Sequence, residues 1–182
     1  MPLLNSITTP YAEAFLQVAD QRGETDEVMA QAKELLALWH ETPSLGEALA
    51  SPVIEVEAKK DVLVKLFADQ LTPSFLNLLK LLTDRSRIGV LDAVLERLLE
   101  LYREQRQIAL ATVTSATPLS DEQQAQLREK VQAVAGTDKV EIKLLVDPAL
   151  IGGFIISLGS QVIDASLSGQ VRRLGLELAR VS

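Results

Sequence analysis

The chain of 182 residues carries 25 acidic and 18 basic side chains, for a formal net charge of −7, and it has one histidine and no cysteine. Without cysteine there is no disulfide scaffold, thiolate catalysis or cysteine-ligated zinc, and a single histidine excludes paired-histidine metal motifs. A pI near 4.8 argues against nucleic-acid binding through bulk charge. The longest uncharged stretch, residues 148–163, is too short and too polar to span a bilayer, so we expect no membrane insertion.

The first 105 residues place apolar side chains at spacings of three and four, which is typical of amphipathic helices. We expect six helices, over the opening segment to about residue 18, from residue 25, and over residues 45–50, 55–68, 72–83 and 87–107. Thr72 and Pro73 give a strong start signal, because threonine caps a helix and the missing N–H of proline costs nothing at the first position. The short polar links between these segments favour a compact bundle.

The inward faces of these helices follow from the same spacing. In the fourth helix, for example, we expect Val62, Leu63, Leu66 and Phe67 to face the core.

The pattern changes near Ile108. Residues 108–115 are uncharged and β-branched, and residues 140–146 alternate between apolar and charged side chains, so both segments are expected to be strands. Between them, Ser120 and Gln123 form a capping box for a helix that should end at Gly136. Residues 154–158 and 161–164 should form a hairpin, followed by a final helix.

These patterns predict a mainly helical α+β protein with a six-helix bundle over residues 1–105 and a small α/β domain over residues 106–182. In the second domain, Leu127, Val131 and Val134 should face inward.

Few residues suggest catalysis. Asp147 and Asp164 can be imagined as paired carboxylates of a small hydrolase, but both stand where strands end, and acidic residues there usually form turns. Gly152 and Gly153 are better explained as a structural kink than as an anion cradle. The residues alone leave open an enzyme of this kind and a free-standing helical adaptor, and they imply no cofactor and no metal.

Residues 147–174 carry the most distinctive pattern. The run DPALIGGFII at 147–156 is followed by Gly159, by VIDAS at 162–166 and by VRRL at 171–174. This order resembles the C-terminal signature of the δ subunit of F-type ATP synthases, whose mitochondrial counterpart is the oligomycin-sensitivity-conferring protein.

Weaker matches in the first half extend the resemblance to nearly the whole chain. They are YAEAF at 11–15, SP at 51–52 and RSRI at 85–88. The sequence at residues 84–89 most resembles that of family members from photosynthetic bacteria.

The resemblance implies a non-catalytic subunit in the stator of a proton-driven rotary ATP synthase. One copy would link the catalytic head of α and β subunits to the b-type subunits of the peripheral stalk and resist the torque of the rotor. It would be a peripheral membrane protein on the cytoplasmic side, at the thylakoid in a photosynthetic host.

In such proteins an N-terminal helix of an α subunit lies in a groove between the first and fifth helices. Carried onto this chain, the groove would be lined by Tyr11, Ala14, Phe15 and Val18 from the first helix and by Leu76, Leu79, Lys80 and Thr83 from the fifth. Stalk contact is expected at Gly159, Arg172 and Arg173.

The acidity is confined to one half of the chain. Residues 1–105 hold 17 acidic and 10 basic side chains, whereas residues 106–182 hold 8 of each. We therefore expect the helical half to prefer a basic or amphipathic partner helix.

Overall fold

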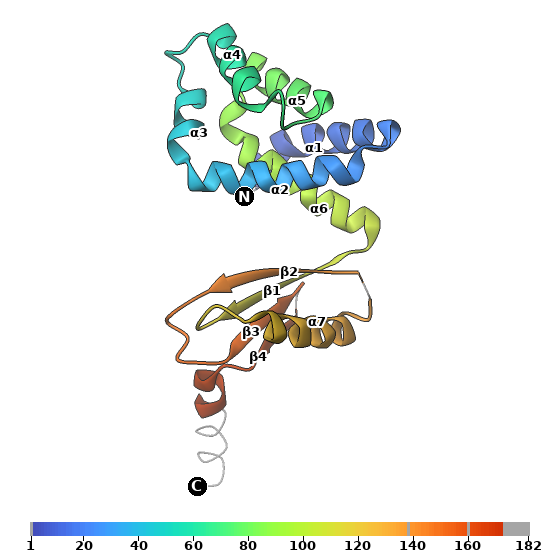
Figure 1. The fold of residues 1–182 in the computed structure, drawn as a ribbon, viewed down its shortest axis with the longest axis vertical. Helices are drawn as coiled ribbons and strands as arrows, with labels where there is room; N and C mark the ends of the chain where they lie inside the picture. Colours follow the sequence, from blue (N-terminus) through green and yellow to red (C-terminus); the bar gives the residue numbers. More distant parts are fainter. Residues whose placement is uncertain (1, 138, 160, 173–182) are drawn as a thin grey trace. The chain divides into compact units, whose positions relative to one another are not determined.

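The computed structural model describes residues 2–137, 139–159 and 161–172. Within them the protein is mainly helical with a small four-stranded sheet, which is an α+β fold (Figure 1). The chain divides into two compact units, here named the helical unit, through Tyr102, and the sheet unit, from Arg103. The sequence places this boundary at residue 105 instead.

The helical unit begins with α1 (Pro2–Arg22), and its other elements follow in chain order. They are α2 (Thr25–Glu41), α3 (Pro43–Ala50), α4 (Val56–Phe67), α5 (Pro73–Asp84), the 3₁₀ turn η1 (Ile88–Val90) and α6 (Leu91–Arg106). The cap expected at α5 is confirmed, since the Thr72 side chain accepts a hydrogen bond from the Phe75 backbone N–H. The α1 helix also contains Pro10, which lies inside it.

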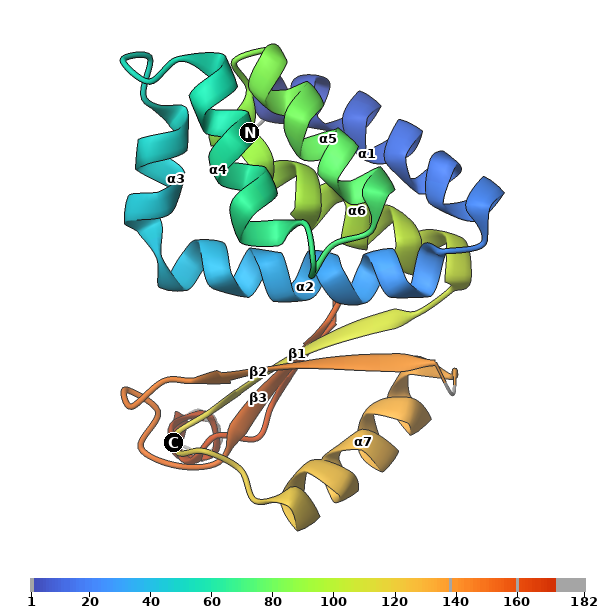
Figure 2. The same ribbon diagram turned by 45° about the horizontal axis from the view of Figure 1, so that its top comes forward.

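The core of the helical unit is built on aromatic and leucine side chains. Phe15 of α1 and Phe75 of α5 pack edge to face with ring centroids 5.2 Å apart, a favourable geometry for aromatic pairs. Fully buried leucines of α5 and α6 complete this packing, among them Leu82 and Leu95. Figure 2 shows α5 running alongside α1, so the aromatic pair fixes the spacing of the two helices.

The predicted inward face of α4 is partly wrong. Leu63 and Phe67 are buried, but Val62 and Leu66 are 41% and 45% exposed. The buried stripe of α4 instead begins at Lys59, which is 7% exposed. The aliphatic stem of a lysine can cover apolar surface while its ammonium reaches outward, so a charged residue concealed the true face.

The sheet unit has one parallel and two antiparallel strand pairs. Its elements are β1 (Ala109–Ser115), α7 (Asp121–Ala135), β2 (Val140–Val146), β3 (Phe154–Leu158) and β4 (Gln161–Asp164). The strand order is β2-β1-β3-β4, with β1 parallel to β2 and antiparallel to β3. The α7 helix connects the parallel pair, as such a pair requires a crossover, and it packs against the sheet (Figure 1).

Both ends of α7 form as expected. Ser120 and Gln123 exchange the two hydrogen bonds of a capping box, and Gly136 takes the left-handed conformation at φ +64°. The core beneath α7 consists of Ala111, Val113, Leu127, Val131, Val140 and Ile156.

One expectation about this core is wrong, since Val134 is 45% exposed. The apolar residues Leu144 and Val146 near the end of β2 are also exposed, at 39% and 51%. β2 is an edge strand. A side chain on such a strand lacks a neighbouring strand on one side, so alternation identifies its face without guaranteeing its burial.

Candidate partner-binding groove

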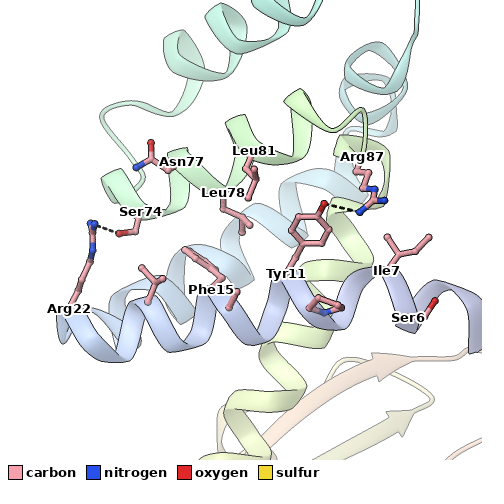
Figure 3. Close-up of a pocket in the computed structure, with 13 residues that line it drawn as sticks. Ser6, Ile7, Tyr11, Phe15, Arg22, Ser74, Asn77, Leu78, Leu81 and Arg87 are labelled. Carbon is pink, nitrogen blue, oxygen red and sulfur yellow. Dashed lines mark hydrogen bonds between the residues drawn. The ribbon is translucent and has the colours of Figure 1, made fainter.

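An apolar groove lies between α1 and α5 (Figure 3). Its volume is about 580 Å³. Apolar residues line the groove along its length, and polar residues lie mainly toward its ends. The lining residues are Ser6, Ile7, Pro10, Tyr11, Ala14, Phe15, Val18 and Arg22 of α1, Ser74, Asn77, Leu78 and Leu81 of α5, and Arg87 beyond α5. An open apolar trough between two helices is a shape that accepts a third helix.

The floor of the groove is held in place by the core beneath it. Phe15 is 5% exposed and rests on Phe75, and Leu78 is 6% exposed. The walls remain open, since Val18 and Leu81 are 38% and 43% exposed. Ala14 lines the groove and is exposed. Its small side chain permits a partner backbone to approach closely.

Each end of the groove carries an arginine that is hydrogen-bonded to a hydroxyl group on the facing element. At one end, Nη1 of Arg22 donates to Oγ of Ser74 over 2.7 Å. At the other, Nη1 of Arg87 donates to the Tyr11 hydroxyl over 2.8 Å, and the Arg87 guanidinium carbon lies 5.7 Å from the centre of the Tyr11 ring. These bonds tie α1 to α5 and to the turn after it (Figure 3).

Of the residues predicted to line a groove, those from α1 line the groove found here and those from α5 do not. Tyr11, Ala14, Phe15 and Val18 all line the groove. The residues expected from the fifth helix do not line it: Leu76, Leu79, Lys80 and Thr83.

Those four residues lie on other faces of α5. Leu79 is fully buried, and Thr83, which is 2% exposed, donates a hydrogen bond to the Leu79 carbonyl over 2.8 Å. Leu76 packs against the core, and Lys80 is half-buried away from the groove. The groove face is offset from them and is marked by Ser74 and Asn77 among the leucines.

The sequence pattern does not identify Arg22 and Arg87 as groove residues. Arg22 is the last residue of α1, and Arg87 lies in the turn after α5. Their hydrogen-bonded partners are 52 and 76 residues away in the sequence, and no local pattern indicates such a pairing.

Three residues of the C-terminal signature form a hydrogen-bonded cluster in the sheet unit: Asp164, Ser166 and Gly169. Oδ1 of Asp164 accepts hydrogen bonds from the backbone N–H and the hydroxyl of Ser166, and the Ser166 hydroxyl accepts one from the Gly169 backbone N–H at 3.0 Å. A Cβ on Gly169 would overlap the Asp164 carboxylate. Asp164 therefore orders the turn into the helix that follows it.

Asp147 has the same kind of role. Its carboxylate accepts a hydrogen bond from the Ala149 backbone N–H over 2.9 Å, which closes the turn after β2. Both aspartates thus form turns. Among the described residues there is no cluster of histidine, aspartate and glutamate side chains that would hold a metal ion.

The predicted stalk-contact residues are only partly described. Gly159 occupies the β3–β4 turn with φ +56°, and Arg172 forms an ion pair with Asp164 at 3.3 Å. Arg173 lies outside the described residues. None of the described helices combines the length and the hydrophobicity that a bilayer-spanning helix needs.

Comparison with known proteins decides the family. The family described as the ATP synthase delta (OSCP) subunit matches residues 7–178. The chain belongs to this family.

Two relatives show how close the similarity to the delta family is. The ATP synthase subunit delta of Prochlorococcus marinus (strain MIT 9303) is 73% identical over all 182 residues of both chains. The organellar chromatophore subunit delta of Paulinella chromatophora is 65% identical over 181 residues, with both chains fully covered.

The fold is also shared with a distant solved structure. A chain in the mitochondrial ATP synthase of Toxoplasma gondii superposes with a TM-score of 0.70, covering 93% of this chain and 96% of that one, at 18% identity. A likeness at that identity shows the fold alone.

Membership in the delta family answers the question of activity. The protein is a non-catalytic structural subunit of an F-type ATP synthase and a component of its peripheral stalk. The hydrolase and free-standing adaptor interpretations are thereby excluded.

Proposed function

We propose that the helical unit acts as a six-helix bundle that docks onto the catalytic head by taking an N-terminal helix of an α subunit into the groove between α1 and α5. The observation that carries this proposal is the groove itself, an apolar trough of about 580 Å³ along two helices. A stator link has to resist torque, and a helix buried along an apolar groove supplies more contact area than a few surface ion pairs.

The groove residues in this proposal combine those predicted on α1 with those found on α5. Tyr11, Ala14, Phe15 and Val18 form one side, and Ser74, Asn77, Leu78 and Leu81 form the other. Leu76, Leu79 and Thr83 pack behind the groove face of α5, and Lys80 lies away from the groove. The rigidity of the Phe15–Phe75 pair favours a groove that is formed before the partner arrives.

The sheet unit is proposed to hold the b-type stalk subunits, with contact near Gly159, Arg172 and Arg173. Exposed apolar residues on its strands support an interaction role, since Val162 and Val146 are 64% and 51% exposed. One copy of the chain would then link head and stalk and hold the head still while the rotor turns. The complex would carry the chain to the cytoplasmic side of the membrane, at the thylakoid in a photosynthetic host.

Calorimetric titration of the full chain with a synthetic peptide of the α-subunit N-terminus tests the docking. We expect saturable binding at micromolar concentration, weakened at least tenfold by Ala14→Arg. Ala14 is exposed in the groove, so the variant should block the site while the protein remains folded.

Ala30→Arg is the matched control, because Ala30 is also exposed on a helix but does not line the groove. It should leave the affinity unchanged. An unchanged affinity in Ala14→Arg would show that the peptide binds elsewhere, and an absence of binding to the unmodified chain would refute the docking proposal.

A further inference from the structure

The electrostatics of the groove differ from those of the unit that contains it. Although residues 1–105 carry an excess of acidic side chains, the only charged residues among those described as lining the groove are Arg22 and Arg87. The expectation of a basic or amphipathic partner helix rests on the net charge of the whole helical half, whereas the charges at this surface are the two arginines. A partner here meets positive charge at both ends and apolar surface between them.

Neither arginine has its charge neutralised within the described part of the chain. Arg22 bonds to the hydroxyl of Ser74, and Arg87 bonds to the hydroxyl of Tyr11 and lies near its ring. Each of these contacts uses one of the five N–H donors of a guanidinium group. They hold the group at the rim of the groove and leave donors free for a planar, bidentate carboxylate contact.

The spacing of the two ends of the groove along α1 can be expressed in residues of a partner helix. Tyr11, which holds Arg87, and Arg22 stand eleven residues apart on α1, which corresponds to about 16 Å along a helix axis. Eleven residues are close to three complete turns at about 3.6 residues per turn. Two side chains at i and i+11 of a partner helix therefore point to the same side.

We propose that the partner helix carries two carboxylates about eleven residues apart, within a turn either way, and that they pair with Arg22 and Arg87 at opposite ends of the groove. This inference rests on the proposed function and adds the chemistry of the occupant. The apolar stretch between the arginines contributes most of the contact. The two charge pairs set how far along the groove the helix lies and favour an acidic amphipathic partner over a basic one.

The probe is a synthetic peptide of the α-subunit N-terminus, compared with a copy in which every Asp and Glu is replaced by Asn and Gln. Both are titrated into the full chain at low and high salt. The natural peptide should bind more tightly, by about twofold to tenfold, and its advantage should shrink as salt rises, because exposed ion pairs are screened.

Variants of the protein locate the effect. Arg22→Gln and Arg87→Gln should each weaken binding of the natural peptide by about 1.5-fold to fivefold, and each should weaken binding of the neutral peptide by less. Lys80→Gln is the matched control, since it removes a cation from α5 away from the groove. Tyr11→Phe and Arg87→Lys separate the Arg87–Tyr11 hydrogen bond from the charge, and Arg87→Lys should retain most of the affinity.

The outcomes separate this inference from the docking it rests on. Equal binding of the natural and neutral peptides overturns the inference and leaves the docking in place. The same holds if Lys80→Gln weakens binding as much as the two arginine variants do. If neither peptide binds the unmodified chain, the proposed docking fails and this inference fails with it.

Discussion

The Cα atom of Gly153 lies directly against the backbone carbonyl of Ala165. A Cβ atom at position 153 would come within 2.4 Å of the Ala165 oxygen and 2.9 Å of the Ser166 Cα, and the residue takes φ +80°. The Ala165 backbone N–H also donates to the Phe154 carbonyl over 3.0 Å. The two most distinctive parts of the C-terminal signature, around residues 153 and 165, therefore touch through their main chains.

Gly153→Ala should destabilise the sheet unit by at least about 3 kcal/mol, because it adds an overlap with main-chain atoms to the usual cost of a left-handed residue. Hydrogen exchange of the β1 and β3 amides measures this loss separately from the helical unit. Gly159→Ala is the control: its φ is +56°, but nothing lies within 4 Å of the added Cβ. It should cost only about 1–2 kcal/mol. Equal effects at the two positions would show that the close approach at Gly153 contributes nothing.

The start of α5 and both ends of α7 were predictable because their signals are local. Each signal acts on a backbone group within four residues, so the local sequence indicates where a helix starts or stops. The signals are Thr72 with Pro73, Ser120 with Gln123, and Gly136.

The orientation of α5 was not predictable in this way. Its sequence PSFLNLLKLLTD has leucines on nearly every side, so a stripe argument cannot separate core from groove. The polar residues Ser74 and Asn77, with Leu78 and Leu81, mark the groove face at spacings of three and four. The arginines at its ends depend on tertiary contacts and have no local signal.

Ser166→Ala should cost the sheet unit about 1–3 kcal/mol, because it removes the acceptor of the Gly169 N–H and a donor to Asp164 at a buried position. Ser168→Ala is a close control. Ser168 is exposed, and among the described residues its side chain hydrogen-bonds to the Ser166 hydroxyl at 3.0 Å, so its loss should cost less than about 0.5 kcal/mol. Hydrogen exchange of the β3 and β4 amides compares the two variants. Similar losses of stability in both would contradict a hydrogen-bonded cluster centred on Ser166.

Phe75→Ala should lower the stability of the helical unit by about 3–5 kcal/mol, since Phe75 is fully buried and supports Phe15 beneath the groove. The single tryptophan, Trp39, lies in this unit and reports its unfolding by fluorescence. Leu81→Ala should behave oppositely: Leu81 is 43% exposed on the groove wall, so stability should change little while binding of the α-subunit peptide weakens. If Leu81→Ala unfolds the unit instead, Leu81 belongs to the core and not to a docking surface.

Lys60 links α4 to the end of α5, and we expect the stability that this link contributes to the helical unit to be lost at alkaline pH. Its ammonium lies 2.5 Å from an Asp84 oxygen and 3.0 Å from a Glu57 oxygen. The hydrogen bond to Asp84, followed by that to Glu57, raises the pKa of Lys60 above its usual value of 10.5. A group whose pKa is higher in the folded protein stabilises it fully below the unfolded pKa, and the stabilisation disappears as pH rises through the folded pKa.

We therefore expect Lys60→Gln to be less stable than the unmodified chain at neutral pH, and the difference to shrink as pH rises above 10.5 and through the raised pKa of Lys60. Trp39 fluorescence in denaturant titrations across this range measures it. Lys65→Gln is the matched control, because Lys65 is an exposed lysine of α4 with no ion pair among the described residues. Its stability difference should be small at every pH. A Lys60→Gln difference that persists unchanged at the alkaline end of this range would show that packing of the side chain, rather than its charge, holds α4 to α5.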